Sequence, residues 1–190
     1  MTDKMELRLS GTGGQGLILA GVILAEAAGV HAGKRVVQTQ SYGPEAQGGA
    51  SRADVIISDG EILHTEVERP DVLLCLSQEA CAKYAKDLKP GGTLIIDPLF
   101  VRDHSAAGGA RVVAVEATRI ATELGRKLVA NVVALGALCG TTGIVDFATL
   151  KSAVLARAPK GTEELNRKAL EAGYEAVRAQ AAAPAVESRR

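Results

Sequence analysis

Residues 7–20 read LRLSGTGGQGLILA and decide the fold of this chain. A short apolar strand, Leu7 to Ser10, runs into a glycine loop, and the loop opens a helix that reaches about Gly29. Glycines let the backbone approach an anion closely, and the free N–H groups of the following helix point towards it. The stretch predicts a phosphate-binding turn, with a plain strand-to-helix turn as the alternative. The G-x-G-x-x-G spacing makes six residues candidates for ligand binding: Gly11, Thr12, Gly13, Gly14, Gln15 and Gly16.

Two well-known glycine-loop sites fit this loop less well. A P-loop requires Lys followed by Ser or Thr after the last glycine, whereas Leu17 and Ile18 stand here. A nicotinamide dehydrogenase holds a ribose hydroxyl with an acidic residue at the end of its second strand. The second strand expected here, 35–40, ends without a carboxylate, and Glu45 comes too late. A nicotinamide site is therefore open but disfavoured, and a site for another phosphate-bearing group or for another protein's backbone remains.

A second glycine-rich loop, residues 41–51, follows that strand. Pro44 stiffens it, and two adjacent glycines permit a close approach or a positive φ. The loop lies at the carboxyl end of the second strand, beside the carboxyl end of the first, where open α/β sheets bind ligands. A surface loop with a tyrosine packed over the sheet is the alternative. The candidate binding residues in this loop are Tyr42, Gly43, Pro44, Glu45, Gln47, Gly48 and Gly49.

Strands and helices alternate along the next part of the chain. Apolar runs predict buried strands at 71–77 and 93–97, a helix at 78–88 between them, and an edge strand at 111–115. Asp59-Gly60 separates strand-like runs at 52–58 and 61–64, which predicts an antiparallel hairpin. The pattern is that of an α/β, three-layer, Rossmann-like domain with a mostly parallel sheet and an antiparallel hairpin.

The C-terminal third of the sequence is helical. Asp146 is placed as the N-cap of a helix to Ala158, and residues 131–141 are apolar on nearly every face, which predicts a buried helix. Further helices are expected at 117–124 and from Thr162 onward. We expect one domain over residues 1–178 and a flexible tail, rich in Ala and then in charge, over residues 179–190.

The overall composition excludes several classes of function. The 190 residues carry 22 basic and 22 acidic side chains, and this balance argues against a nucleic-acid or membrane-surface footprint. Aromatic residues make up only 3%, with no Trp, which argues against base-stacking platforms. The polar start and the lack of a long apolar run predict neither a signal peptide nor a transmembrane span, and hence a cytoplasmic protein.

The remaining reactive side chains form no catalytic pattern. No C-x-x-C pair occurs, so we expect buried thiols and neither a metal nor an iron–sulfur site at Cys75, Cys81 and Cys139. No Ser-His-Asp or Cys-His arrangement is evident. We expect His64 to be exposed and Asp54 to be solvated, and helix ends or subunit contacts to be held by Asn131 and Asn166.

The ordered set of motifs resembles the gamma subunit of 2-oxoacid:ferredoxin oxidoreductases. The same domain occurs fused in pyruvate:ferredoxin oxidoreductase and in indolepyruvate oxidoreductase. The set is specific although the single motifs are not, and it covers roughly residues 5–178. It consists of GTGGQG at 11–16, QSYGPEAQGG at 40–49, VIIS at 55–58, DVLL at 71–74, KPGG at 89–92, NVVALGA at 131–137, ELN at 164–166 and GYE at 173–175.

The resemblance implies an accessory subunit in a hetero-oligomer. In this family, thiamine diphosphate lies between the alpha and beta subunits, and iron–sulfur clusters lie in other chains or domains. The assembly decarboxylates a 2-oxoacid, passes electrons to ferredoxin or a ferredoxin-like subunit, and transfers the acyl group to coenzyme A; some members run in the reductive direction. The gamma domain lies where coenzyme A approaches, and the pyrophosphate of coenzyme A suits a phosphate-binding loop. We therefore expect this chain to bind no cofactor alone and to contribute no catalytic residue.

Position 47 departs from the family's pattern, because many relatives have Gly-Pro-Glu-x-Arg-Gly-Gly where this chain has Gln47. A glutamine can hydrogen-bond but cannot neutralise a phosphate, and Arg52 could supply that charge instead. The short Ser-Tyr-Gly-Pro-Glu loop followed by VIIS favours 2-oxoglutarate, with pyruvate, branched-chain oxoacids and indolepyruvate left open. The other functional hypotheses are a stand-alone dinucleotide-binding oxidoreductase and a purely structural subunit.

Overall fold

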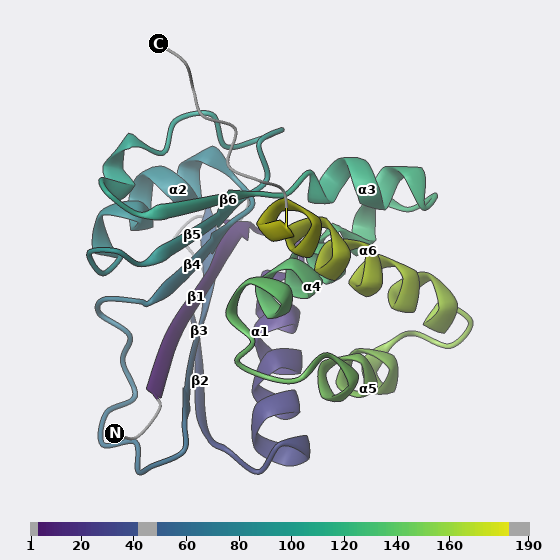
Figure 1. Cartoon of the computed structure of the whole chain (residues 1–190), viewed down its shortest axis with the longest axis horizontal. Helices are drawn as coiled ribbons and strands as arrows, with labels where there is room; N and C mark the ends of the chain where they lie inside the picture. The colour runs from purple at the N-terminus through teal and green to yellow at the C-terminus, as the bar shows by residue number, and fades with distance from the viewer. Residues whose placement is uncertain (1–3, 42–48, 183–190) are drawn as a thin grey trace.

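The centre of the molecule is a six-stranded mixed sheet (Figure 1). The computed structural model describes residues 4–41 and 49–182. The strand order is β2-β3-β1-β4-β5-β6. Strands β1, β4, β5 and β6 are parallel, whereas β3 runs antiparallel to both β1 and β2. The strands are β1 (Lys4–Thr12), β2 (Arg35–Ser41), β3 (Ala50–Ser58), β4 (Val72–Cys75), β5 (Thr93–Ile96) and β6 (Arg111–Ala114).

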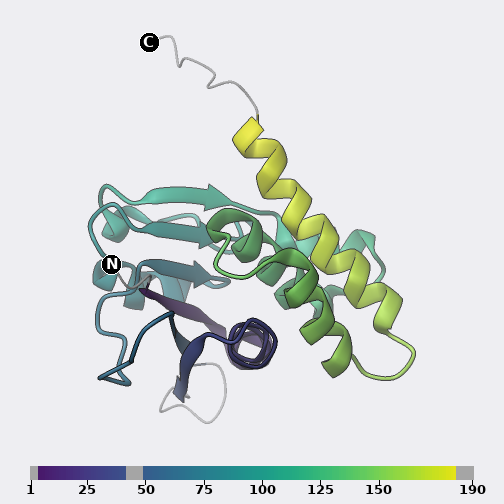
Figure 2. The same ribbon diagram turned by 60° about the horizontal axis from the view of Figure 1, so that its bottom comes forward.

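Helices cover both faces of this sheet and make three layers. Helix α2 covers one face, and α1 with the C-terminal helices α4, α5 and α6 covers the other (Figures 1 and 2). The helices are α1 (Leu17–Glu26), which continues as a π-helix at Ala27–His31, α2 (Gln78–Tyr84), α3 (Ala117–Glu123), α4 (Ala130–Thr142), α5 (Phe147–Arg157) and α6 (Glu163–Ala182). The predicted three-layer α/β class is confirmed.

Strand alternation divides the core between the two faces. Leu7 and Leu9 of β1 pack with α1 and the C-terminal helices, whereas Leu73 and Cys75 of β4 pack against α2. The first cluster is the larger because five helices, α1 and α3 to α6, contribute to it. Successive side chains of a strand point to opposite faces, so this arrangement follows directly from the apolar runs of the central strands.

The predicted hairpin at Asp59-Gly60 is wrong. Residues 61–67 form no strand and have no regular secondary structure. The physical reason lies in β3, whose two edges are both occupied: Val55 pairs with Leu7 of β1 on one side and with Gln38 of β2 on the other. The antiparallel pairing of the sheet therefore involves β1, β2 and β3.

The predicted helical ends agree with the structure in the C-terminal third. Asp146 caps α5, accepting hydrogen bonds from the N–H groups of Ala148 at 2.8 Å and Thr149 at 3.3 Å. Asn166 donates to the carbonyl of Thr162 at 2.9 Å and so holds the start of α6. Helix α4 is buried from residue 131 to residue 139, as predicted.

Helix α6 extends further than the sequence indicated. Residues 179–182, expected to fray, are its last residues, and the Nε2 of Gln180 donates to the carbonyl oxygen of Ala114 on β6 at 2.8 Å. The rest of the expected tail, residues 183–190, lies outside the described residues. Within residues 4–41 and 49–182, no helix combines the length and the apolar character that crossing a membrane requires.

Candidate functional site

The glycine loop joins the carboxyl end of β1 to α1 with a left-handed backbone at Gly14 (φ +89°) and Gly16 (φ +75°). A Cβ atom at Gly11 would lie 2.3 Å from the side-chain oxygen of Gln15, and one at Gly16 would lie 2.5 Å from the side-chain nitrogen of Asn131. A Cβ atom at Gly13 or Gly14 would meet no atom within 4 Å. The left-handed backbone favours glycine at 14 and 16, and a Cβ atom at 11 would displace the side chain of Gln15. Position 13 has neither constraint.

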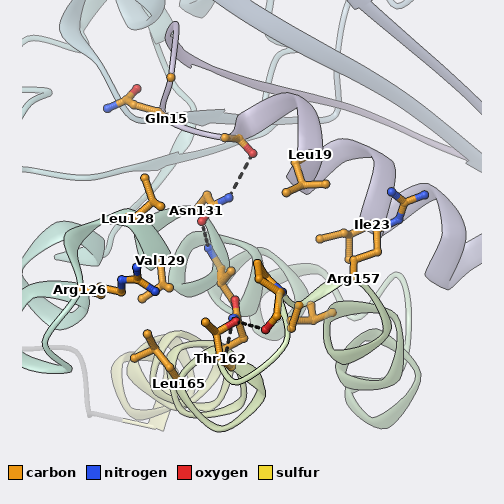
Figure 3. Close-up of a pocket in the computed structure, with 17 residues that line it drawn as sticks. Gln15, Leu19, Ile23, Arg126, Leu128, Val129, Asn131, Arg157, Thr162 and Leu165 are labelled. Carbon is orange, nitrogen blue, oxygen red and sulfur yellow. Dashed lines mark hydrogen bonds between the residues drawn. The ribbon is translucent and has the colours of Figure 1, made fainter.

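Two side chains fix the shape of this loop. The Oε1 of Gln15 accepts from the N–H of Thr12 at 2.7 Å, and its Nε2 donates to the carbonyl of Leu76 at 2.9 Å. The Nδ2 of Asn131, at the start of α4, donates to the carbonyl of Gly16 at 3.2 Å (Figure 3). Gln15 therefore shapes the loop through both ends of its amide, and Asn131 joins the loop to the C-terminal helices.

The N–H groups at the turn are available to an anion. Those of Gly13, Gly14 and Gly16 donate to no acceptor in the part of the chain that the structure describes. The N-cap residue of helix α1 is Gly16, so no side chain caps the helix. Free N–H groups and the positive end of the helix dipole together favour a bound negative charge.

Two hollows flank the loop, and both include Gly14, Gln15 and the side chain of Leu128. The first, about 390 Å³, lies between the carboxyl ends of β1 and β4 and also includes Leu76 and Phe100. The order of the strands switches at β1. After β1 the chain forms β2 and β3 on one side of it, and then crosses to form β4, β5 and β6 on the other side. Such a switch point is the usual ligand site of an open α/β sheet.

The second hollow, about 260 Å³, lies between α1 and the C-terminal helices (Figure 3). Its walls are apolar at Leu19, Ile23 and Leu165, with Arg126 and Arg157 among the lining residues. Leu128 is 72% exposed and belongs to both hollows. An apolar side chain so exposed beside a polar loop suits contact with a ligand or a partner.

Three cations, Arg126, Lys127 and Arg157, line the two hollows, but they are not equally available. Arg157 is held by the carboxylate of Glu26, with an Nε–Oε2 distance of 2.6 Å. Arg126 and Lys127 make no ion pair within the described residues. The Nζ of Lys127 lies 5.5 Å from the centre of the Phe100 ring. These cations were not among the residues predicted from the sequence, although an adjacent Arg-Lys pair just before a buried helix is a visible signal.

The second predicted loop is mostly outside the described residues, namely Tyr42, Gly43, Pro44, Glu45, Gln47 and Gly48. Its two ends are described. Ser41 ends β2, and Gly49 is buried next to Ala50, which pairs with Thr12 of the glycine loop. The loop therefore leaves and re-enters the sheet at the carboxyl end of β1, as predicted.

The side chain of Arg52 lies on the α2 face of the sheet. Its Nε is 3.5 Å from a carboxylate oxygen of Asp54, and its guanidinium lies 5.6 Å from the centre of the Tyr84 ring. Helix α1 covers the opposite face, so the suggestion that Arg52 replaces the missing charge of position 47 receives no support from these contacts.

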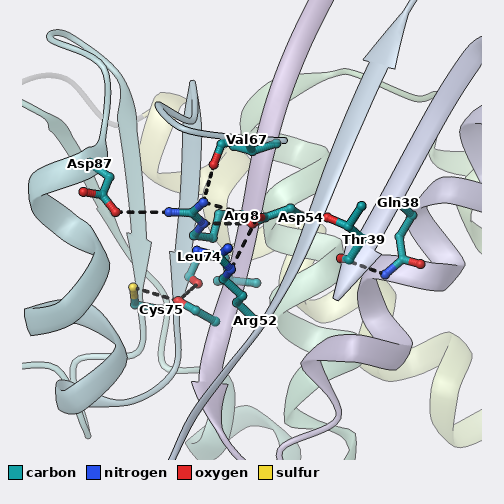
Figure 4. Close-up of polar contacts among 10 residues, drawn as sticks. Arg8, Gln38, Thr39, Arg52, Asp54, Val67, Leu74, Cys75 and Asp87 are labelled. Carbon is teal, nitrogen blue, oxygen red and sulfur yellow. Dashed lines mark hydrogen bonds and ion pairs between the residues drawn. The ribbon is translucent and has the colours of Figure 1, made fainter. Parts of the chain in front are cut away.

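The expectation that Asp54 is solvated is wrong, because it is 4% exposed. Its Oδ1 accepts from the Nε of Arg8 at 2.8 Å, in a buried ion pair between β1 and β3 (Figure 4). Arg8 also donates to Asp87 at 3.2 Å and to the carbonyl of Val67. This cluster lies under α2, away from the glycine loop.

The three cysteines are buried thiols. Contact with Cys81 and burial raise the pKa of Cys75 well above its ordinary value, and burial raises the pKa of Cys139 to about 11. Across the described ranges, no three His, Cys, Asp or Glu side chains are grouped so that they could hold a metal ion. His64 is exposed, as predicted, and contacts Glu6 at 3.2 Å.

Comparison with known proteins adds the following similarities. Residues 6–176 match the family model described as pyruvate ferredoxin/flavodoxin oxidoreductase. The chain is 49% identical to the 2-oxoglutarate synthase subunit KorC of Methanocaldococcus jannaschii, over 90% of this chain and 93% of KorC. A keto/oxoacid ferredoxin oxidoreductase gamma subunit from Geobacter sulfurreducens superimposes with a TM-score of 0.83 at 50% identity, over 92% of this chain and 99% of that one.

A larger protein also contains this fold. The 2-oxoglutarate:ferredoxin oxidoreductase from Magnetococcus marinus, with 2-oxoglutarate, coenzyme A and succinyl-CoA bound, aligns with a TM-score of 0.82 at 25% identity. The alignment covers 98% of this chain and 32% of that one. The domain thus occurs both as a separate chain and as part of a longer one.

Proposed function

Because the chain belongs to the pyruvate ferredoxin/flavodoxin oxidoreductase family, we propose that it is the gamma subunit of a cytoplasmic, coenzyme A-dependent 2-oxoglutarate:ferredoxin oxidoreductase. The observation that carries the proposal is the 49% identity with a 2-oxoglutarate synthase subunit over nearly the whole of both chains. The assembly oxidatively decarboxylates 2-oxoglutarate, transfers the acyl group to coenzyme A and passes the electrons to ferredoxin. Alpha and beta subunits hold the thiamine diphosphate, and a ferredoxin-like chain or ferredoxin holds the iron–sulfur clusters.

The role of this chain is to bind coenzyme A and to contribute to assembly. The phosphates of coenzyme A are strong anionic acceptors, and the turn offers free N–H groups at Gly13 and Gly14 beside the cations of Arg126 and Lys127. The apolar side chains of Leu128 and Phe100 suit the less polar parts of the same molecule. No group in this arrangement acts on the 2-oxoacid, so the chemistry stays with the partner subunits.

A stand-alone dinucleotide-binding oxidoreductase is disfavoured by the sheet. A nicotinamide fingerprint needs the second strand directly beside the first, where its acidic end can reach the ribose. Here β3 lies between β1 and β2 and runs antiparallel to both. The described end of β2 also carries no carboxylate, since it reads Gln38, Thr39, Gln40 and Ser41.

Purified alone, the chain is expected to show no dye reduction that depends on 2-oxoglutarate and coenzyme A. Adding the thiamine-diphosphate subunits and the ferredoxin-like partner should produce that activity. The measurement is the initial rate of viologen reduction for each combination of subunits. A rate for the isolated chain comparable to that of the full assembly would refute the proposed division of roles.

Substitution of Gly13 by valine tests the coenzyme A site. The position has open space and no left-handed backbone, so the folded chain should accept the side chain, while a phosphate should not. We expect the KM for coenzyme A of the assembled enzyme to rise about tenfold or more, because one charge-assisted hydrogen bond contributes roughly 1.5–3 kcal/mol and 1.4 kcal/mol is a factor of ten. Gly13→Ala should give a smaller rise.

The KM for 2-oxoglutarate and the melting temperature of the isolated chain serve as internal controls for Gly13→Val. Both should stay at the wild-type value, because the substitution reaches neither the 2-oxoacid site nor the core. An unchanged KM for coenzyme A in a correctly assembled enzyme would mean that the loop is only a turn. The structural-subunit hypothesis would then be favoured.

A further inference from the structure

The segment Glu61–Arg69, between β3 and β4, is mostly exposed, bends at Glu68 and Arg69, and belongs to no helix or sheet. Within the described residues, none of its backbone N–H or C=O groups pairs with another backbone group. Seven of its nine residues are exposed, and Leu63 is 84% exposed. Unpaired backbone N–H and C=O groups on an exposed segment are available for pairing with another chain.

Side chains from the sheet hold this segment in place. The buried guanidinium of Arg8 donates to the carbonyl of Val67, whose side chain is 4% exposed (Figure 4). The Nε2 of His64 lies 2.7 Å from the Nζ of Lys4 and 3.2 Å from a carboxylate oxygen of Glu6. Both anchors use β1, so the segment is already held against the sheet before any partner approaches.

The charge of the segment indicates what it would bind. It contains three glutamates, Glu61, Glu66 and Glu68, against one arginine. None of these glutamates forms an ion pair in the described part of the chain. A hollow of about 600 Å³ lies beside it, lined by Glu6, His64, Thr65, Glu66, Glu68 and Arg69. Burial opposes ionisation of Glu6, yet hydrogen bonds from Lys4 and His64 keep its pKa below the ordinary value. The Glu6 carboxylate is already paired with Lys4 at 2.6 Å and with Lys89 at 3.7 Å, so the negative charge left for a partner comes from Glu66 and Glu68.

We propose that Glu61–Arg69 is a docking strand for a partner subunit of the same assembly. The partner lays an extended, basic segment along it, pairs with its free backbone groups, covers Leu63 and places a Lys or Arg side chain in the acidic hollow. Backbone pairing supplies affinity, and the leucine and the carboxylates supply specificity. The inference rests on the proposed function only for the existence of the partner subunits, since the glycine loop lies at the opposite end of β1.

Hydrogen exchange tests the docking strand directly. In the isolated chain the amides of residues 61–69 should exchange rapidly, because they have no internal acceptor. In the assembled oxidoreductase they should exchange at least about tenfold more slowly. An assembly that is active with 2-oxoglutarate and coenzyme A but leaves these amides unprotected would overturn the docking strand and leave the proposed function intact. Protection that appears in the isolated chain on raising its concentration would also overturn it, by assigning the surface to a second copy.

Two variants test the chemistry of the surface. Leu63→Asp, and separately the double change Glu66→Lys with Glu68→Lys, should each weaken binding to the remaining subunits about tenfold or more, as measured by titration of the purified chain. Leu99→Asp is the matched control, since Leu99 is a 52% exposed leucine beyond β5, at the other end of the sheet. Circular dichroism of each isolated variant checks folding. Binding of both variants at the affinity of the Leu99 control would overturn the proposal.

Discussion

Replacing Gly173 of α6 by alanine is expected to destabilise the fold by about 3 kcal/mol, lowering the melting temperature by roughly 6–12 °C. A Cβ atom there would lie 1.9 Å from the carbonyl oxygen of Val133 on α4. Gly136 on α4 has the reciprocal contact, 2.1 Å from the carbonyl oxygen of Leu170. The atoms that would have to move are backbone atoms of a buried helix, so the two helices must separate along the crossing that Figure 2 shows.

Thermal unfolding of the isolated chain measures this effect, and its sign is informative. On an exposed helix face, alanine in place of glycine would stabilise by about 1 kcal/mol. A gain of stability for Gly173→Ala would therefore contradict the close packing of α4 and α6. Glu175→Ala is the matched control, because Glu175 is exposed on the same helix and should change stability by less than about 0.5 kcal/mol.

Local sequence signals predicted most of the fold. The apolar run of β4, the cap at Asp146 and the small apolar residues of α4 depend on neighbours within a few positions, and all three agree with the structure. The hairpin at Asp59-Gly60 failed because its outcome depends on a distant strand. The turn signal was strong, but β2 and β1 already occupied both edges of β3. The turn propensity of Asp59-Gly60 depends on local residues only, so it does not predict which strands compete for the edges of β3.

Only part of the candidate site could be predicted from the sequence, because the rest depends on contacts between residues that are far apart in the chain. The spacing of the glycines identified the loop, because tight turns have local requirements. The partner of Gly16 is Asn131, which is 115 residues away, and the cations at 126 and 127 reach the loop only through the packing of α4. Arg8 offered a weak clue, since a charge inside a strand buried on both faces must find a partner. That the partner is Asp54 follows from the register of β1 and β3.

Removing the carboxylate of that pair, by Asp54→Ala, is expected to cost about 3–5 kcal/mol. Arg8 is 2% exposed, and without Asp54 its guanidinium keeps only the partly exposed Asp87 and the carbonyl of Val67 as acceptors. A buried charge that loses its buried counter-ion is left under-compensated, because the partly exposed Asp87 lies against solvent and replaces only part of the lost interaction. The melting temperature should fall by roughly 6–20 °C.

The double variant Arg8→Met, Asp54→Leu distinguishes two contributions to the free energy of unfolding: the cost of leaving Arg8 without its buried partner, and the net stabilisation by the ion pair itself. Replacing both ions by apolar side chains leaves no charge buried, so the double variant should recover most of the stability lost by Asp54→Ala. Glu116→Ala breaks an exposed pair with Arg119 and should cost less than about 1 kcal/mol. If Asp54→Ala costs no more than Glu116→Ala, the guanidinium is hydrated rather than buried. Arg8 also donates a hydrogen bond to the carbonyl of Val67, and the double variant loses this bond. We therefore expect the double variant to stay folded but to bind the partner subunits more weakly. That result would show that the buried pair between β1 and β3 helps to position the docking strand.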